Sequence, residues 1–124
     1  SEGRVNKHDW GRACRFFPGF RNSPGVIRTA WELCDLFNEE LACAYPTRET
    51  LARRLGSPKE SVSRWLRDLS SSGAITCTGL RSLSPAVRSE IGRSAKRAQV
   101  YELNFGWATD VLIYRDQLIF IEIN

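Results

Sequence analysis

The chain has 124 residues, of which 42% are apolar and 26% charged, which suits one domain with one hydrophobic core. It contains no run of about 18 apolar residues, so a transmembrane helix and a membrane partner are excluded. No apolar stretch of the kind found in signal peptides follows the N-terminus, so we expect a cytoplasmic protein, associated with the nucleoid if it binds DNA.

Positive charge is unevenly distributed along the chain. The net charge of +4 comes from 18 Lys and Arg residues against 14 Asp and Glu residues. Residues 47–97 hold eleven basic and four acidic residues, a net +7, whereas residues 23–46 and 98–124 each carry −3. Concentrated positive charge is typical of polyanion binders. An ordinary solvated basic surface gives the same pattern, so charge alone does not choose between them.

Residue types that catalysis or metal binding requires are sparse. The chain has one histidine, His8, and its cysteines form no C-x-x-C pair, so we expect no metal site and no cofactor. Glycine-rich phosphate-binding motifs and the H-E-x-x-H motif are also absent. We therefore predict that the protein is not an enzyme and has no catalytic residues. The four cysteines are expected to be core thiols in a reducing compartment: Cys14, Cys34, Cys43 and Cys77.

Residues 1–22 are predicted to form a basic and aromatic N-terminal arm. Its four aromatic side chains predict that part of the arm packs against the domain, although it could also lie along a phosphate backbone. Its glycines and its proline are expected to prevent a long helix. The aromatic residues are Trp10, Phe16, Phe17 and Phe20, and the helix breakers are Gly11, Pro18 and Gly19.

Residues 23–108 are predicted to form a domain that begins with three helices. The first starts at Ser23-Pro24 and continues to about Ala44, with apolar residues at three- and four-residue spacing. The second covers Arg48 to Leu55, with Gly56 as a left-handed C-cap. The third starts at the capping box Ser57-Pro58-Lys59-Glu60 and ends near Ser71.

After the helices the apolar spacing changes to two, which predicts strands at 74–80 and 98–105. The segment between them, 81–97, is long for a hairpin loop and strongly basic, and Ser84-Pro85 could start one helical turn inside it. Residues 109–124 form an apolar C-terminal extension. We predict a β-hairpin there, with a helix as the alternative, serving dimerisation or the binding of a partner.

Three segments resemble the winged helix-turn-helix of bacterial, plasmid and phage DNA-binding proteins, which include replication initiators and transcription regulators. They are Ala44 to Leu55 (AYPTRETLARRL), Gly56 to Ile75 (GSPKESVSRWLRDLSSSGAI) and Arg97 to Leu103 (RAQVYEL). The resemblance covers roughly residues 23–105. It implies an α+β fold of three helices and a two-stranded β wing, to which this chain would add its C-terminal hairpin. It also implies that the third helix enters the major groove and that the wing contacts the neighbouring backbone or minor groove.

The residue types of the predicted third helix fit this interpretation. Glu60, Arg64 and Arg67 lie opposite its apolar side, and the two arginines have the reach and planar donors to read guanine. Cations of the second helix would contact phosphate and so position the domain. The candidate DNA-binding residues are Ser57, Lys59, Ser63, Arg64 and Arg67 in the third helix, Thr47, Arg48 and Arg53 in the second, and Arg88, Arg93, Lys96 and Arg97 in the wing.

These residues also have purely structural interpretations. Arg53 and Arg54 could simply solvate the second helix, and Arg67 could pair with Asp68 or Glu60. The sequence thus predicts sequence-dependent binding of double-stranded DNA, in transcription regulation or in replication control of a plasmid or phage. The alternative is a protein–protein interaction module that binds its partner through the winged helix and the apolar C-terminal segment.

Overall fold

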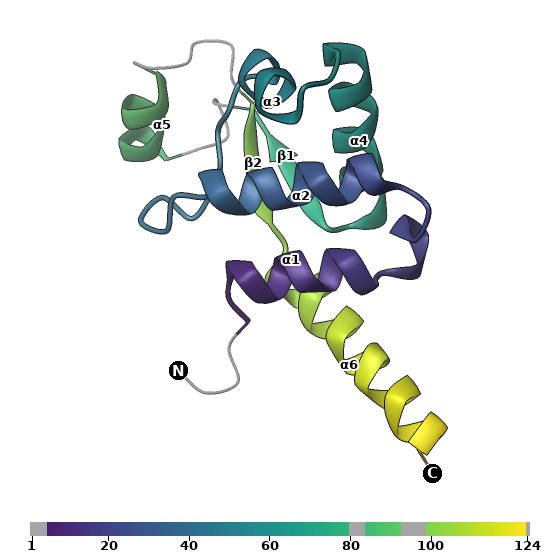
Figure 1. Cartoon of the computed structure of the whole chain (residues 1–124). Helices are drawn as coiled ribbons and strands as arrows, with labels where there is room; N and C mark the ends of the chain where they lie inside the picture. The colour runs from purple at the N-terminus through teal and green to yellow at the C-terminus, as the bar shows by residue number, and fades with distance from the viewer. Residues whose placement is uncertain (1–4, 80–83, 93–98, 124) are drawn as a thin grey trace.

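The computed structural model describes residues 5–79, 84–92 and 99–123 and has an α+β fold (Figure 1). Helices pack around one two-stranded antiparallel sheet. No helix among the residues described is long and apolar enough to cross a membrane. In chain order the elements are α1 (Lys7–Phe16), the 3-10 helix η1 (Pro18–Phe20), α2 (Pro24–Leu36), α3 (Arg48–Leu55), α4 (Lys59–Ser72), β1 (Ile75–Thr78), α5 (Pro85–Gly92), β2 (Val100–Leu103) and α6 (Phe105–Ile123).

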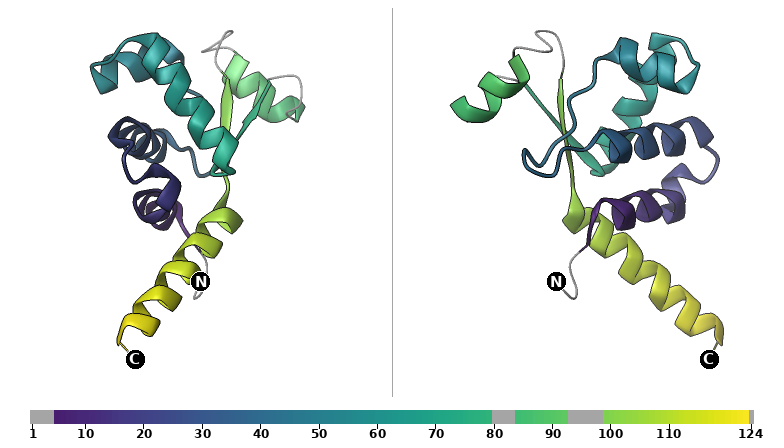
Figure 2. Two further views of the ribbon diagram at one scale, coloured as in Figure 1. Left: turned by 90° about the vertical axis from the view of Figure 1, so that its right-hand side faces the viewer. Right: turned by 60° about the vertical axis from the view of Figure 1, so that its left-hand side comes forward.

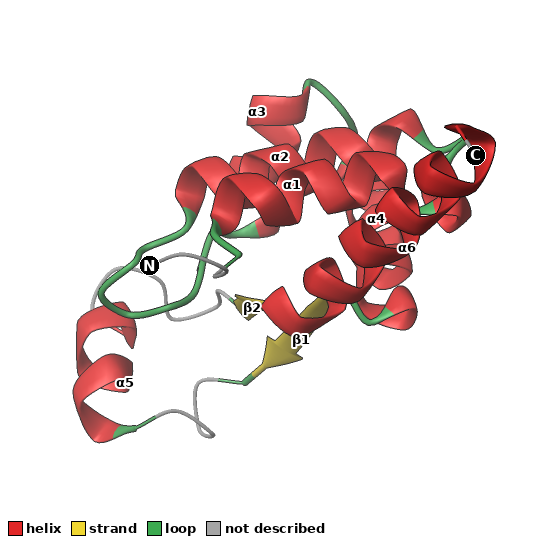
Figure 3. Cartoon of the chain, turned by 90° about the horizontal axis from the view of Figure 1, so that it is seen from below, coloured by secondary structure: helices red, strands yellow, loops and turns green. Residues whose placement is uncertain are grey.

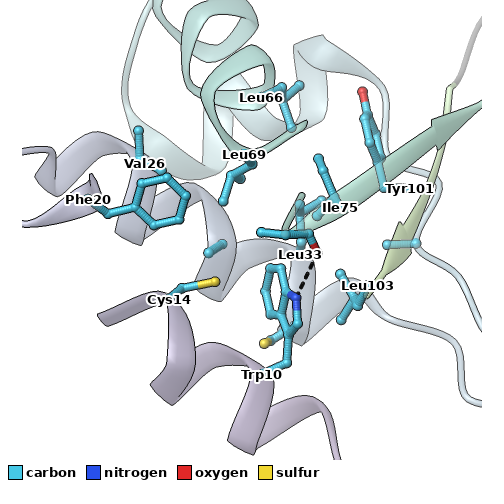
Figure 4. Packing of buried hydrophobic residues seen from close by; sticks show 14 of the residues in the cluster. Trp10, Cys14, Phe20, Val26, Leu33, Leu66, Leu69, Ile75, Tyr101 and Leu103 are labelled. Carbon is cyan, nitrogen blue, oxygen red and sulfur yellow. Dashed lines mark hydrogen bonds between the residues drawn. The ribbon is translucent and has the colours of Figure 1, made fainter. Parts of the chain in front are cut away.

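Helix α1 lies within the N-terminal segment and is part of the core. Trp10, Ala13 and Cys14 are fully buried, which confirms that part of this segment packs against the domain (Figure 4). The expectation that Gly11 breaks a helix is wrong, because Gly11 lies in the middle of α1. A Cβ atom at Gly11 would lie 3.2 Å from the sulfur of Cys34 on α2, so glycine allows the two helices to approach closely.

Helix α2 is shorter than its apolar spacing predicts, since it ends at Leu36 and not near Ala44. The side chain of Asn38 accepts a hydrogen bond from the Leu41 N–H at 2.9 Å, and this local bond competes with a continuing helix. Ala44 then pairs with Tyr101 of β2 through two backbone hydrogen bonds of 2.9 and 2.7 Å. The backbone of Ala44 is therefore used by the sheet and not by a helix.

Helices α3 and α4 are joined by residues 56–58. The predicted bounds of α3 are confirmed, and Gly56 ends it with φ = 60°, in the left-handed region that glycine adopts without strain. The predicted capping box is wrong: α4 begins at Lys59, and no side chain caps it. Ser57 instead belongs to the end of α3: its hydroxyl donates to the Leu55 carbonyl at 3.1 Å, and its backbone N–H donates to the Ala52 carbonyl at 3.0 Å.

Strands β1 and β2 confirm the two predicted strands in shortened form. Their register pairs Ile75 with Leu103 and Cys77 with Tyr101. Ile75 and Leu103 are buried, whereas Cys77 is exposed and so is not the core thiol that the sequence indicated. Seen from below, α5 lies apart from the other helices, beyond the strands (Figure 3).

The C-terminal segment is one helix, so the predicted hairpin is wrong. Ala108 and Leu112 of α6 pack into the core, and the Arg115 guanidinium lies 3.9 Å from the centroid of the Phe16 ring on α1. These residues are spaced by four and three, which is the helical period, and α1 offers a complementary surface. The later turns of α6 project from the rest of the molecule (Figure 2).

Candidate nucleic-acid interface

Arg54 of α3 connects this helix to α2 through ion pairs. Arg54 forms an ion pair with Glu32 at 2.5 Å between Nε and Oε2, and a second ion pair with Asp35. The hydrogen bond and the charge of Glu32 raise the pKa of the Arg54 guanidinium. Arg28 of α2 also donates to the Leu55 carbonyl at 2.8 Å, which satisfies an acceptor at the end of α3. Arg54 therefore belongs to the α2–α3 junction and not to a candidate interface.

Helix α4 presents its polar side to solvent, as the sequence predicts. Val62, Leu66 and Leu69 are buried, whereas Arg64 and Arg67 are exposed. Among the described residues, neither arginine has a carboxylate within ion-pairing distance. The alternative that Arg67 pairs with Asp68 or Glu60 is therefore not observed. Both guanidinium groups keep their donors available for a ligand.

A hollow of about 230 Å³ lies between α3, α4 and the sheet. Arg48 of α3 and Arg67 of α4 both line it, so cations from two helices converge on one space. Hydroxyl donors lie around them, and the hollow is otherwise lined by Leu66 and by residues of the two strands. Its remaining polar lining residues are Ser63, Ser70, Ser71, Cys77, Gln99 and Tyr101.

Two side chains that line this hollow from the strands, Tyr101 and Cys77, have raised pKa values. Burial raises the pKa of Tyr101 to about 12, although the positive charge of Arg48 acts in the opposite direction. Partial burial also raises the pKa of the Cys77 thiol, while a hydrogen bond with Ser70 and the charge of Arg48 oppose this effect. Tyr101 therefore remains a neutral donor at neutral pH, and none of the described residues that line the hollow is a carboxylate. Such a lining suits an anion.

A second hollow, of about 420 Å³, adjoins the N-terminus of α3. It shares Arg48, Gln99 and Tyr101 with the first, and adds Thr47, Glu49 and Lys59. Lys59 pairs with Glu49 at 3.1 Å, and both side chains are largely exposed, so this ion pair contributes little and is easily exchanged. The Thr47 hydroxyl accepts a hydrogen bond from the Thr50 N–H at 3.0 Å, so its first role is to cap α3.

The structure thus brings together some of the sequence-predicted site residues and separates others. Those around the two hollows are Thr47, Arg48, Lys59, Ser63 and Arg67. Arg53 and Arg64 are exposed but line neither hollow, and Ser57 is turned toward the end of α3. Arg88 is exposed on α5. Arg93, Lys96 and Arg97 lie outside the described residues.

Sequence reasoning missed the residues that close the first hollow from the sheet, above all Cys77, Gln99 and Tyr101. The signal for two of them was present in the strand alternation. Cys77 lies two residues after Ile75, and Tyr101 lies two before Leu103, so each pair shares one face of its strand. Which two strand residues face each other depends on the register, and the sequence alone does not supply it.

No known protein family, curated protein or solved structure matches the chain. Within the part of the chain that the structure describes, no three His, Cys, Asp or Glu side chains gather in a group that could hold a metal ion.

Proposed function

We propose that this protein is a winged helix-turn-helix protein that binds double-stranded DNA in a sequence-dependent way. The observation that carries the proposal is the convergence of Arg48 and Arg67, from two different helices, on one open hollow whose described lining residues include no carboxylate. We place its role in transcription regulation, or in replication control of a plasmid or phage.

The order and connection of the elements support this proposal. Helices α3 and α4 are joined by a three-residue turn, as in a helix-turn-helix, and an antiparallel β-ribbon follows them. Ala44, between α2 and α3, pairs with Tyr101 of β2 through an isolated antiparallel bridge, so the chain before α3 lies beside β2. Three helices interleaved with such a sheet define the winged-helix arrangement, and the segment between β1 and β2, with α5, would be the wing.

In the proposed complex α4 enters the major groove. Arg64 and Arg67 are exposed on its outer side and would donate to the O6 and N7 atoms of guanine. Each such bidentate contact contributes about 1–3 kcal/mol of discrimination between bases. Helix α4 presents these side chains over its first three turns, because Leu66 and Leu69 anchor its opposite side in the core.

Phosphate groups would occupy the hollows beside α4. Arg48 provides a charged donor, and the hydroxyls of Ser63 and Ser70 provide neutral ones at the edge of the same space. Contacts of this kind fix the position of a protein on the duplex without reading its sequence. Arg53 and Arg88, both exposed, would reach neighbouring phosphates from α3 and from the wing, and we propose the same contact for the wing residues Arg93, Lys96 and Arg97.

Selection of bound fragments from a random duplex library tests the proposal. We expect a defined sequence motif to be enriched, and the selected duplex to lose roughly a thousandfold in affinity between about 50 and 200 mM salt, if six or more phosphates are contacted. A lack of enrichment would refute sequence-dependent binding. Affinity for a protein partner that barely changes with salt would favour the interaction module instead.

A further inference from the structure

One side of α6 carries a regular spacing of apolar residues, which we call the seam. Trp107, Val111, Tyr114, Leu118 and Ile121 follow one another in alternating steps of four and three residues along this 19-residue helix. That spacing places all five positions on one side of the helix and is the heptad pattern of a coiled coil. The first two are covered within the chain, since Val111 is 9% exposed and the rings of Trp107 and Phe17 are 5.2 Å apart.

Beyond Val111 the seam is open to solvent at Tyr114. The side chain of Tyr114 is 51% exposed, and it borders an apolar groove of about 390 Å³ between η1 and α6. Phe17, Pro18 and Trp107 line the other parts of this groove. The backbone of the helix then continues away from the remaining elements (Figures 1 and 2). By sequence spacing, Leu118 and Ile121 take the next two seam positions. A heptad seam on a projecting helix is the pattern through which helices of the same kind pair in coiled coils.

The charges beside the seam identify a second copy of this chain as that partner. With Val111 as an a position and Tyr114 as a d position, Asp110 occupies g and Arg115 occupies the following e. In a parallel pair of helices, g of one chain faces this e of the other, so a twofold axis would place Asp110 opposite the partner's Arg115 twice. Within the described residues neither side chain has an ion-pair partner in its own chain.

A contact within the chain already positions the Arg115 side chain. Its guanidinium carbon lies over the Phe16 ring at 3.9 Å, a cation–π contact that does not use the N–H donors in hydrogen bonds. From this geometry we infer that the protein forms a parallel homodimer through α6, with Tyr114 at the centre of the open seam and reciprocal Asp110–Arg115 pairs beside it. The inference does not depend on DNA binding.

Tyr114 and its neighbour Ile113 provide a matched test. Both are about half exposed, at 51% and 50%, but Ile113 lies roughly 100° away from the seam around the helix. We expect the full chain without DNA to sediment as a concentration-dependent dimer. Tyr114→Glu should raise the dissociation constant by about tenfold or more, because it puts a charge into an apolar contact, and Ile113→Glu should leave it unchanged. A wild-type protein that stays monomeric at every concentration, or equal effects of both substitutions, would overturn the inference.

A charge exchange tests the parallel orientation independently. Asp110→Arg should weaken the dimer, because it places like charges opposite each other at two sites, and adding Arg115→Asp should restore it. Circular dichroism checks that each variant is folded. Failure of the double variant to regain the dimer, with helix content unchanged, would exclude the parallel pairing.

Discussion

The indole N–H of Trp10 donates a buried hydrogen bond of 2.9 Å to the carbonyl oxygen of Ala74. The two residues are 64 positions apart in the chain, and the bond connects α1 to the residue that precedes β1 (Figure 4). The N-terminal segment is thereby tied to the point where the chain passes from α4 into the sheet. Residues that the sequence assigns to an arm therefore help to support the proposed DNA-binding unit.

Trp10→Phe should destabilise the protein by about 2–4 kcal/mol. The substitution removes one of the two donors to the Ala74 carbonyl, the other being the Asn104 N–H at 2.9 Å, and it also removes part of a fully buried ring. Urea unfolding followed by circular dichroism measures the change. Trp31→Phe is the control, because Trp31 is 37% exposed, and we expect it to cost less than about 1 kcal/mol. Equal effects of both substitutions would contradict a special role for the Trp10–Ala74 bond.

Gly25→Ala should also destabilise the fold, by about 1–3 kcal/mol. A Cβ atom at Gly25, in the first turn of α2, would lie 2.1 Å from the Trp65 ring, so the indole would have to move. Gly106→Ala is the matched control. A Cβ at Gly106, near the start of α6, would meet no atom within 4 Å, and the better helix former should stabilise the protein by about 0.5–1 kcal/mol. Thermal unfolding distinguishes the two, and a stable Gly25→Ala variant would show that Trp65 adapts freely.

Arg64→Ala and Arg67→Ala should each reduce specific DNA binding by about 1–3 kcal/mol while the fold is retained. Both side chains are exposed and make no ion pair with the described residues, so their loss removes contacts to DNA and not to the protein. Competition between the selected duplex and single-base variants gives the discrimination. Arg15→Ala, an exposed position in α1, is the control and should have no effect. Unchanged discrimination would remove the two α4 arginines from base reading.

Cys77 should be the first of the four cysteines to react with an alkylating reagent, and DNA should slow the reaction. Its thiol is exposed and lines the hollow that we assign to phosphate, whereas Cys14, Cys34 and Cys43 are buried. Burial raises the pKa of Cys34 to about 11, so near neutral pH this group is a thiol and not the reactive thiolate. The pKa of Cys77 is also raised, so its reaction should accelerate as pH increases.

Mass spectrometry of peptides after brief exposure to iodoacetamide, with and without the selected duplex, measures this order. A duplex without the motif, at the same concentration and low salt, is the control for non-specific coverage. Reaction of Cys77 at an equal rate with and without bound specific DNA would show that the hollow is not covered in the complex.

The sequence by itself determined the elements whose signals are local. The bounds of α3 and the left-handed Gly56 follow from short-range turn chemistry, and the exposed side of α4 follows from helical spacing. Helical spacing and residue type also indicate Arg48, Ser63 and Arg67 as candidate DNA-binding residues, and all three line the first hollow.

Tertiary structure decided everything that depends on contacts between distant segments. Residues 109–124 are apolar in a pattern that suits strand or helix, and the structure shows a helix to Ile123 whose first turns pack against α1. The pairing of Ala44 with Tyr101, 57 residues later in the chain, draws into the sheet a residue that the apolar spacing assigns to the helix. The strand register pairs Cys77 with Tyr101, and together these two residues line the hollow that Arg48 and Arg67 line from the helices. Local propensity is a weak preference, and the larger free energy of burial and backbone pairing overrides it.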